Sequence, residues 1–335
     1  MKLNLAEFKT DFLEASNNID KVTRFWNKYN YKPFDLLNIG HHWQLRERVF
    51  SLLRTCKEID SAAFARIHKG NPYYFIGISS YLLDDFQTAV YFFDASVTED
   101  MNAGADPIDN PKPSTHFLML EGEASNQSAK KLTEFVQAKV ERALNYYQVN
   151  VIKSDVVSPL TIDKLRKDFI YRALTTKNRP GLRTLVTAFI TFCIEWDFRK
   201  DHFEYGVGNG TSEPFFSHLF RGCILFESLL MHNPVNMPVG KNLGSVLTEK
   251  AIKEKLGIGE IKGKGGGEIF VLDDVFEELI KYDESIHETI KITYMARNTF
   301  GHNLGWDSNI GHDQYQKLYF IIVSACLHVI ACLWK

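Results

Sequence analysis

The segment TYMARNTFGHNLGW, residues 293–306, is the stretch around which the rest of the chain can be understood. It closes a long helical pattern that starts near Asp273, and a strongly apolar helical stretch follows it. Arg297, Asn298 and His302 fall where the first of these helices is expected to end. The segment therefore predicts an all-α fold in which two long helices present polar side chains at one helix end.

The length, composition and net charge of the chain limit its possible folds and functions. The chain has 335 residues, which is long for a single core and favours two domains. Hydrophobic residues make up 45% and charged residues 24%, as in an ordinary folded domain. The net charge of −2 gives no general attraction to nucleic acid or to an anionic membrane. Any site for a polyanion must therefore be a local patch.

The five cysteines are scattered, odd in number and without a C-x-x-C pair, which favours reduced thiols in a cytoplasmic protein over a disulfide frame or a zinc site. The opening MKLNLAEFKTDFLEAS carries acidic residues where a signal peptide needs an apolar run. The stretch 318–334 is at the lower limit of length for a membrane span and contains Ser324 and His328, so we expect a buried core helix and no membrane. Neither a cofactor nor a metal is expected.

Residues 70–101 form a recognisable unit, two helices joined at Asp84 and Asp85. Small residues stand where the helices must cross closely, and large residues flank them. The unit resembles a tetratricopeptide repeat, with Tyr73, Ile76, Gly77, Ala89 and Phe93 on the expected positions, and with Ser80 and Met101 where that family usually has Tyr and Pro. The resemblance implies that neighbouring hairpins complete the stack and that a protein partner binds this half. A generic helical hairpin is the alternative.

The second half also follows helical periodicity, and we place the domain boundary near residue 155, giving domains 1–155 and 156–335. The glycine-dense segment 257–268 lacks the ending of a phosphate loop and is expected to be a surface loop. The short run 115–120 fits either a strand or the start of a helix.

The geometry of the polar residues depends on how the helix ends. On an ideal helix Arg297 and His302 point about 140° apart, whereas Asn298 and His302 share a face. The two residues converge only if the helix ends or distorts at Gly301, or if a partner chain completes the site. Glycine at this position favours the first solution.

The motif Arg297-Asn298-Thr-Phe-Gly-His302 resembles the R-x4–6-H motif of the HEPN superfamily, a group of all-helical ribonuclease and nucleotide-binding domains. That family prefers Asn, Asp or His directly after the arginine, and Asn298 fits. The resemblance covers about residues 179–335. It implies a metal-independent endoribonuclease that binds RNA and forms a homodimer, with two motifs facing one cleft; a defence or toxin-type role follows only by analogy.

The chemistry of these residue types agrees with that implication. Cleavage of RNA without a metal needs a base for the 2′-OH proton and a cation for the charged phosphorane. Imidazoles such as that of His302 titrate near neutral pH, and the guanidinium of Arg297 offers a fixed fork of donors. Asn298 would orient the imidazole or the phosphate. Two alternatives stay open. One is a non-catalytic scaffold; the other is a structural role in which Arg297 pairs with an acid such as Glu284 or Asp307 and His302 caps a helix end.

Overall fold

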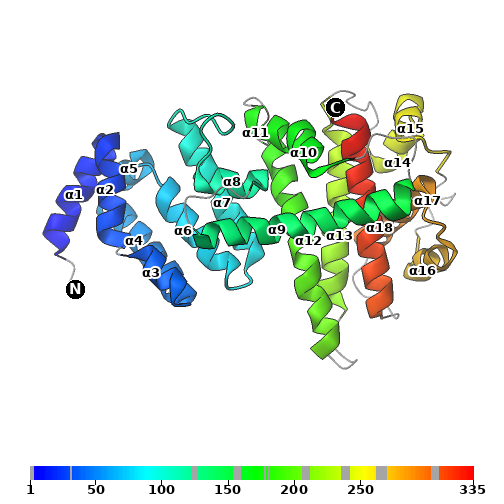
Figure 1. Cartoon of the computed structure of the whole chain (residues 1–335), viewed down its shortest axis with the longest axis horizontal. Coiled ribbons are helices and arrows are strands. Elements are labelled where there is room, and N and C mark those ends of the chain that lie inside the picture. The colour runs from blue at the N-terminus through cyan, green and yellow to red at the C-terminus, as the bar shows by residue number, and fades with distance from the viewer. Residues whose placement is uncertain are drawn as a thin grey trace. The chain divides into compact units, whose positions relative to one another are not determined.

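The computed structural model describes residues 4–30, 32–121, 127–153, 160–176, 179, 181–205, 212–234, 242–261, 270–302 and 309–335. Every regular element in these ranges is a helix, so the predicted all-α fold is confirmed (Figure 1). The helices pack into two compact units, Met1–Phe135 and Val136–Lys335. Each unit has a core of its own and is described separately.

The helices of the first unit are α1 (Leu5–Asn17), α2 (Ile19–Asn30), α3 (Pro33–Asn38), α4 (His42–Ile59), α5 (Ser61–Arg66), α6 (Gly70–Tyr81), α7 (Phe86–Asn102) and α8 (Pro113–Met119). The run 115–120, which fitted a strand or a helix, lies mainly in α8. Helix α9 (Gln127–Tyr146) begins in the first unit and continues into the second.

The hairpin of α6 and α7 has the close crossing that the sequence predicts. A Cβ on Gly77 would lie 2.8 Å from the ring of Phe93, so the helices could not approach this closely with a larger residue there. Ala89 is fully buried in the same contact region. Asp84 adopts the left-handed conformation (φ 59°), and the Asp85 carboxylate caps α7 by accepting from the Thr88 amide.

The helices of the second unit, besides the end of α9, include two π-helices, η1 (Tyr147–Ile152) and η2 (Arg166–Tyr171). The others are α10 (Ile162–Leu165), α11 (Arg172–Thr175), α12 (Gly181–Tyr205), α13 (Glu213–Met231), α14 (Leu243–Thr248), α15 (Lys250–Leu256), α16 (Leu272–Lys281), α17 (Ile286–His302) and α18 (His312–Leu333).

Helix α18 is the centre of the second unit. It packs against α12, α13, α15 and α17, and its side chains from Leu318 to Val329 are all buried. It is the one helix in the described ranges that is long and apolar enough to cross a membrane, and 72% of its most apolar window is buried inside the unit. That burial is the pattern of a core helix.

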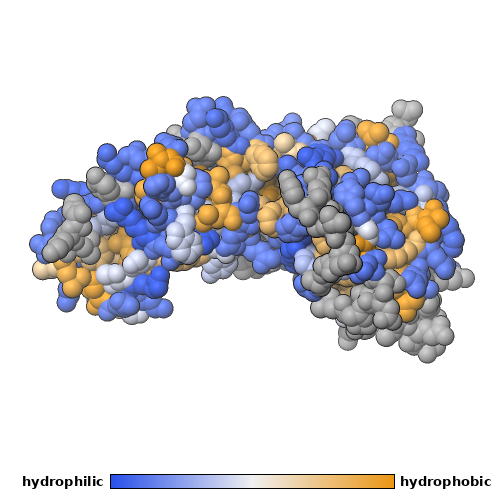
Figure 2. All heavy atoms as spheres, turned by 90° about the horizontal axis from the view of Figure 1, so that it is seen from below, coloured by the Kyte–Doolittle hydropathy of each residue, from blue (hydrophilic) through white to orange (hydrophobic). Residues whose placement is uncertain are grey.

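Figure 2 shows hydrophilic residues over much of one face of the chain, with hydrophobic residues in separate patches.

The long helix expected from Asp273 onward is two helices, and that part of the prediction is wrong. Helix α16 ends at Lys281, and Glu284 takes a left-handed conformation (φ 62°) before α17 begins. The Asp283 carboxylate accepts from the Ser285 amide, and the Ser285 hydroxyl accepts from the Glu288 amide, which stabilises a new helix start. These local hydrogen bonds compete with the continuation of a single helix.

Candidate functional site

Arg297 lies in the second-last turn of α17 and faces α13. Its Nε donates to Oε2 of Glu227 at 2.7 Å, and the two side chains are 30% and 17% exposed. No described residue accepts a hydrogen bond from either Nη of Arg297. Because Nε alone is engaged, the outer edge of the guanidinium keeps donors for a further acceptor.

Glu227 is the partner that sequence reasoning missed. The alternative in which Arg297 pairs with an acid is confirmed, but the acid is Glu227, and Glu284 as the partner is wrong. Glu284 precedes α17 and pairs with Lys153 at 3.3 Å, and the 13 positions to Arg297 span about 20 Å of helix. Asp307 lies outside the described residues. The only signal in the sequence for Glu227 is a charged residue in the apolar pattern of α13.

The rest of the motif continues the helix without a break. The predicted end or distortion at Gly301 is wrong, because α17 runs through Gly301 to His302. Asn298 is half-buried, and no described residue hydrogen-bonds to its side chain. The side chain of His302 lies outside the described residues. The backbone nevertheless places Asn298 and His302 four positions apart on one helix face, and Arg297 on another.

Packing on both sides fixes the last turns of α17. The ring of Phe300 is buried and lies 5.4 Å from that of Phe216 on α13. Thr299 is fully buried and donates to the Phe270 carbonyl at 3.2 Å. A Cβ on Gly301 would meet Phe220 at 3.4 Å, an ordinary contact. The position of Arg297 is therefore set by a rigid, buried helix face.

A second charged group of the second unit lies on α12. Glu195 on α12 is 4% exposed and accepts from Arg221 and from Arg199. Beside it, His218 is buried, and burial lowers the pKa of its imidazole well below the usual range. Its Nε2 lies 3.0 Å from the Phe192 carbonyl, so that nitrogen carries the proton and Nδ1 accepts from the Tyr315 hydroxyl.

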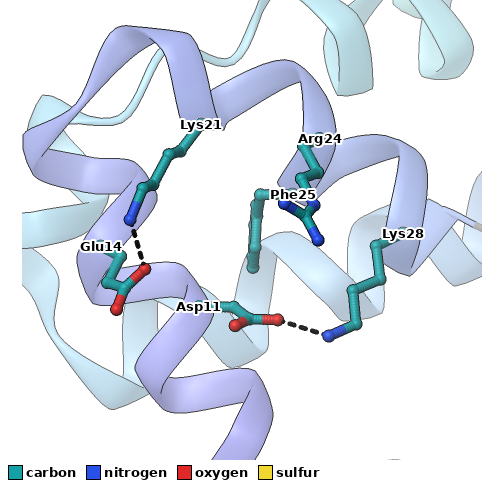
Figure 3. Close-up of a pocket in the computed structure, with 6 residues that line it drawn as sticks. All are labelled: Asp11, Glu14, Lys21, Arg24, Phe25 and Lys28. Carbon is teal, nitrogen blue, oxygen red and sulfur yellow. Dashed lines mark hydrogen bonds and ion pairs between the residues drawn. The ribbon is translucent and has the colours of Figure 1, made fainter.

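The first unit holds a pocket of about 220 Å³ between α1 and α2 (Figure 3). The facing helices carry opposite charges, with Lys21 bonded to Glu14 at 2.7 Å and Lys28 to Asp11 at 2.6 Å. The hydrogen bond from Lys28 lowers the pKa of the Asp11 carboxyl. Arg24 also lines the pocket, so three cations face two carboxylates and the lining carries one net positive charge. Within the described ranges, His, Cys, Asp and Glu side chains form no group of three suited to a metal ion.

Comparison with family models, with curated proteins and with solved structures finds no match to this chain. The geometry of the site therefore carries the functional argument.

Proposed function

We propose that the second unit is a HEPN-like endoribonuclease that cleaves RNA without a metal, by attack of the 2′-OH on the neighbouring phosphate. The observation that supports it is the half-exposed Arg297, which Glu227 holds through Nε while both Nη atoms have no described partner. A guanidinium held in this way has little freedom to lose when it binds a phosphate.

The roles of the other residues follow from their positions on α17. The imidazole of His302 would accept the 2′-OH proton, which passes from the hydroxyl to the ring as the oxygen attacks phosphorus. Arg297 would stabilise the negative charge of the phosphorane, and the products would be a 2′,3′-cyclic phosphate and a 5′-hydroxyl. Asn298, on the same face as His302, would orient the ring or the phosphate.

A regular helix keeps Arg297 and His302 apart, and this geometry favours a homodimer. Because α17 runs through Gly301 to His302, positions 297 and 302 lie about 140° apart around the helix axis. We propose that a two-fold axis brings Arg297 of one copy to His302 of the other. Such an enzyme would work in the cytoplasm, and a role in defence is one setting for it.

Cleavage of mixed RNA by the purified chain in EDTA tests the activity. We expect cyclic-phosphate products from the wild type and a loss on the order of 100-fold or more in Arg297→Ala and in His302→Ala. Arg142→Ala is the matched control, because Arg142 also pairs with an acid, Asp197 at 2.6 Å. Equal activity in all four proteins, or no cleavage of any RNA, would overturn the proposal.

Mixing the two inactive variants tests the shared site. If each site takes Arg297 from one copy and His302 from the other, subunit exchange restores roughly a quarter of the wild-type sites. If both residues act within one copy, the mixture stays inactive.

A helical adaptor is the second candidate, and it rests on the tetratricopeptide-like half. Trp43 and Tyr91 are 57% and 67% exposed, and Arg46 lies 5.2 Å from the centre of the Trp43 ring. Large exposed aromatic side chains next to arginine are enriched at protein interfaces. Trp43→Ala and Tyr91→Ala would then abolish the capture of a protein partner, without affecting cleavage of RNA.

A further inference from the structure

One face of α13 stays open between α12 and α17, two of the helices that pack on it. Arg221, Ile224 and Glu227 follow one another at intervals of three, which turns them by about 60° at each step. Ile224, in the middle, is 41% exposed. Arg221 pairs with Glu195 of α12 on one side, and Glu227 pairs with Arg297 of α17 on the other. The open face is therefore bordered by arginines on both sides.

The arginine pair on the α12 side is held by one buried carboxylate. Arg221 approaches Glu195 end-on, with Nη1 3.0 Å from Oε1 and Nη2 2.6 Å from Oε2. Arg199, one turn further along α12, donates from Nε and Nη2 to Oε2 at 3.3 and 3.2 Å. The side chain of Glu195 is only 5% exposed, whereas that of Arg221 is 36% exposed. The carboxylate thus fixes two guanidinium groups, that of Arg221 at the surface and that of Arg199, whose side chain is 16% exposed, largely beneath it.

The charges of this group do not cancel. Two guanidinium groups on one carboxylate leave one positive charge, and His218 beside them is neutral because burial lowers its pKa. Donors also remain, since the end-on contact leaves Nε of Arg221 unused and the side-on contact leaves Nη1 of Arg199 unused.

We propose that Arg199 and Arg221 form a second phosphate-binding site, which holds the RNA strand next to the phosphate at Arg297. The proposal rests on the proposed ribonuclease function. Arg221 and Glu227 are six residues apart on α13, about 9 Å along the axis, a span that a short stretch of single-stranded RNA can bridge. Both arginine groups border the same open face, and the chain as a whole is negatively charged, so the positive charge here is local.

The salt dependence of RNA binding tests this assignment. We expect Arg221→Gln to weaken binding of a single-stranded oligoribonucleotide about 3- to 10-fold, and to reduce the slope of log K against log [salt] by about 0.7, the value for one lost phosphate contact. The variant leaves Arg199 and Glu195 as a neutral pair, so the fold is expected to survive. Arg199→Gln leaves the bidentate pair intact and provides a second, independent variant.

The control is Arg142→Gln, which removes the same charge from a pair with Asp197 on the opposite side of α12. Slopes that are equal in the wild type, Arg221→Gln and Arg199→Gln would overturn the second site. If Arg297→Gln alone lowers the slope, only this inference fails and the proposed function stands. If the wild-type chain binds no RNA, both proposals fail.

Discussion

His328 shows how burial sets the chemistry of a single residue. It lies on α18 and is 7% exposed. Its Nε2 lies 2.9 Å from the Leu256 carbonyl and must carry a proton, so Nδ1 accepts from the Tyr147 hydroxyl, also at 2.9 Å. Burial lowers the pKa of His328 to about 4, although the Leu256 carbonyl partly opposes the shift. The residue is therefore a neutral, fully bonded part of the core.

This low pKa predicts how stability depends on pH. Between about pH 6.5 and 4 the unfolded chain binds a proton at His328 and the folded chain does not, so the free energy of unfolding falls as the pH falls. The contribution reaches roughly 3 kcal/mol at pH 4. His328→Gln should remove it, which chemical unfolding at several pH values would measure. His312→Gln, on the same helix, is the control, and equal slopes in the two variants would contradict the prediction.

Glu227 gives a prediction about catalysis. Because it fixes Arg297 through Nε, Glu227→Gln should loosen the guanidinium and lower kcat for RNA cleavage on the order of 10-fold, with a smaller effect on KM. Steady-state kinetics with a defined oligoribonucleotide would measure both constants. Glu278→Gln, which breaks the pair between Glu278 on α16 and Lys291 on α17, serves as the control. A kcat unchanged from that of the wild type would show that Glu227 has no such role.

For single residues, the sequence predicts which residue types a site contains better than it predicts which side chains they contact. Arg297 and Asn298 lie on α17 as their spacing indicates. Glu227 is 70 positions away in the chain, and nothing in one sequence tells which distant acid will meet an arginine. The same holds for Glu195, which pairs with Arg199 on its own helix and with Arg221 on α13.

Among the elements, the helices richest in apolar residues were predicted well; α18, for instance, is buried on every side from Leu318 to Val329. The hairpin of α6 and α7 and the core helix α18 are examples. The break between α16 and α17 was missed because the apolar pattern continues across it. Asp283 and Ser285 were the available signal, since both residue types favour the start of a helix.

The crossing of α12, α13 and α18 gives a prediction about packing. A Cβ on Gly222 would lie 2.3 Å from the ring of Phe192 and 2.8 Å from Ile322, so Gly222→Ala should destabilise the second unit by about 1–3 kcal/mol. Gly181→Ala is the control on α12, because its Cβ would meet nothing within 4 Å. It should be neutral or raise stability by up to about 1 kcal/mol. Urea unfolding of both variants would measure the difference, and equal midpoints would contradict it.

For the whole molecule, the sequence predicts two domains with a boundary near residue 155, and this stays a prediction. The compact units meet at Phe135 and Val136, inside the continuous helix α9, whereas the sequence favoured a boundary near residue 155. Composition gives no signal inside a helix, because the same amphipathic pattern serves both units. Only the contacts of the folded chain show at which residue of α9 the first unit ends and the second begins.

Because each unit has its own core, we expect the second unit to fold and to cleave RNA without the first. A fragment of residues 127–335 keeps α9 whole and every helix that packs on α18, so it should fold and cleave RNA within roughly threefold of the full chain. Circular dichroism and the cleavage assay would measure both properties. The same fragment with His302→Ala is the control. A fragment that folds but does not cleave would place part of the activity in the first unit.

The central position of α18 has a consequence during synthesis on the ribosome. Its neighbours α12, α13, α15 and α17 are all translated before it, and each of them keeps an apolar face uncovered until α18 emerges. The first unit has no such delay and can fold while translation continues. The nascent second unit therefore exposes apolar surface until α18 has been synthesised. This makes it the part of the polypeptide that depends most on chaperones.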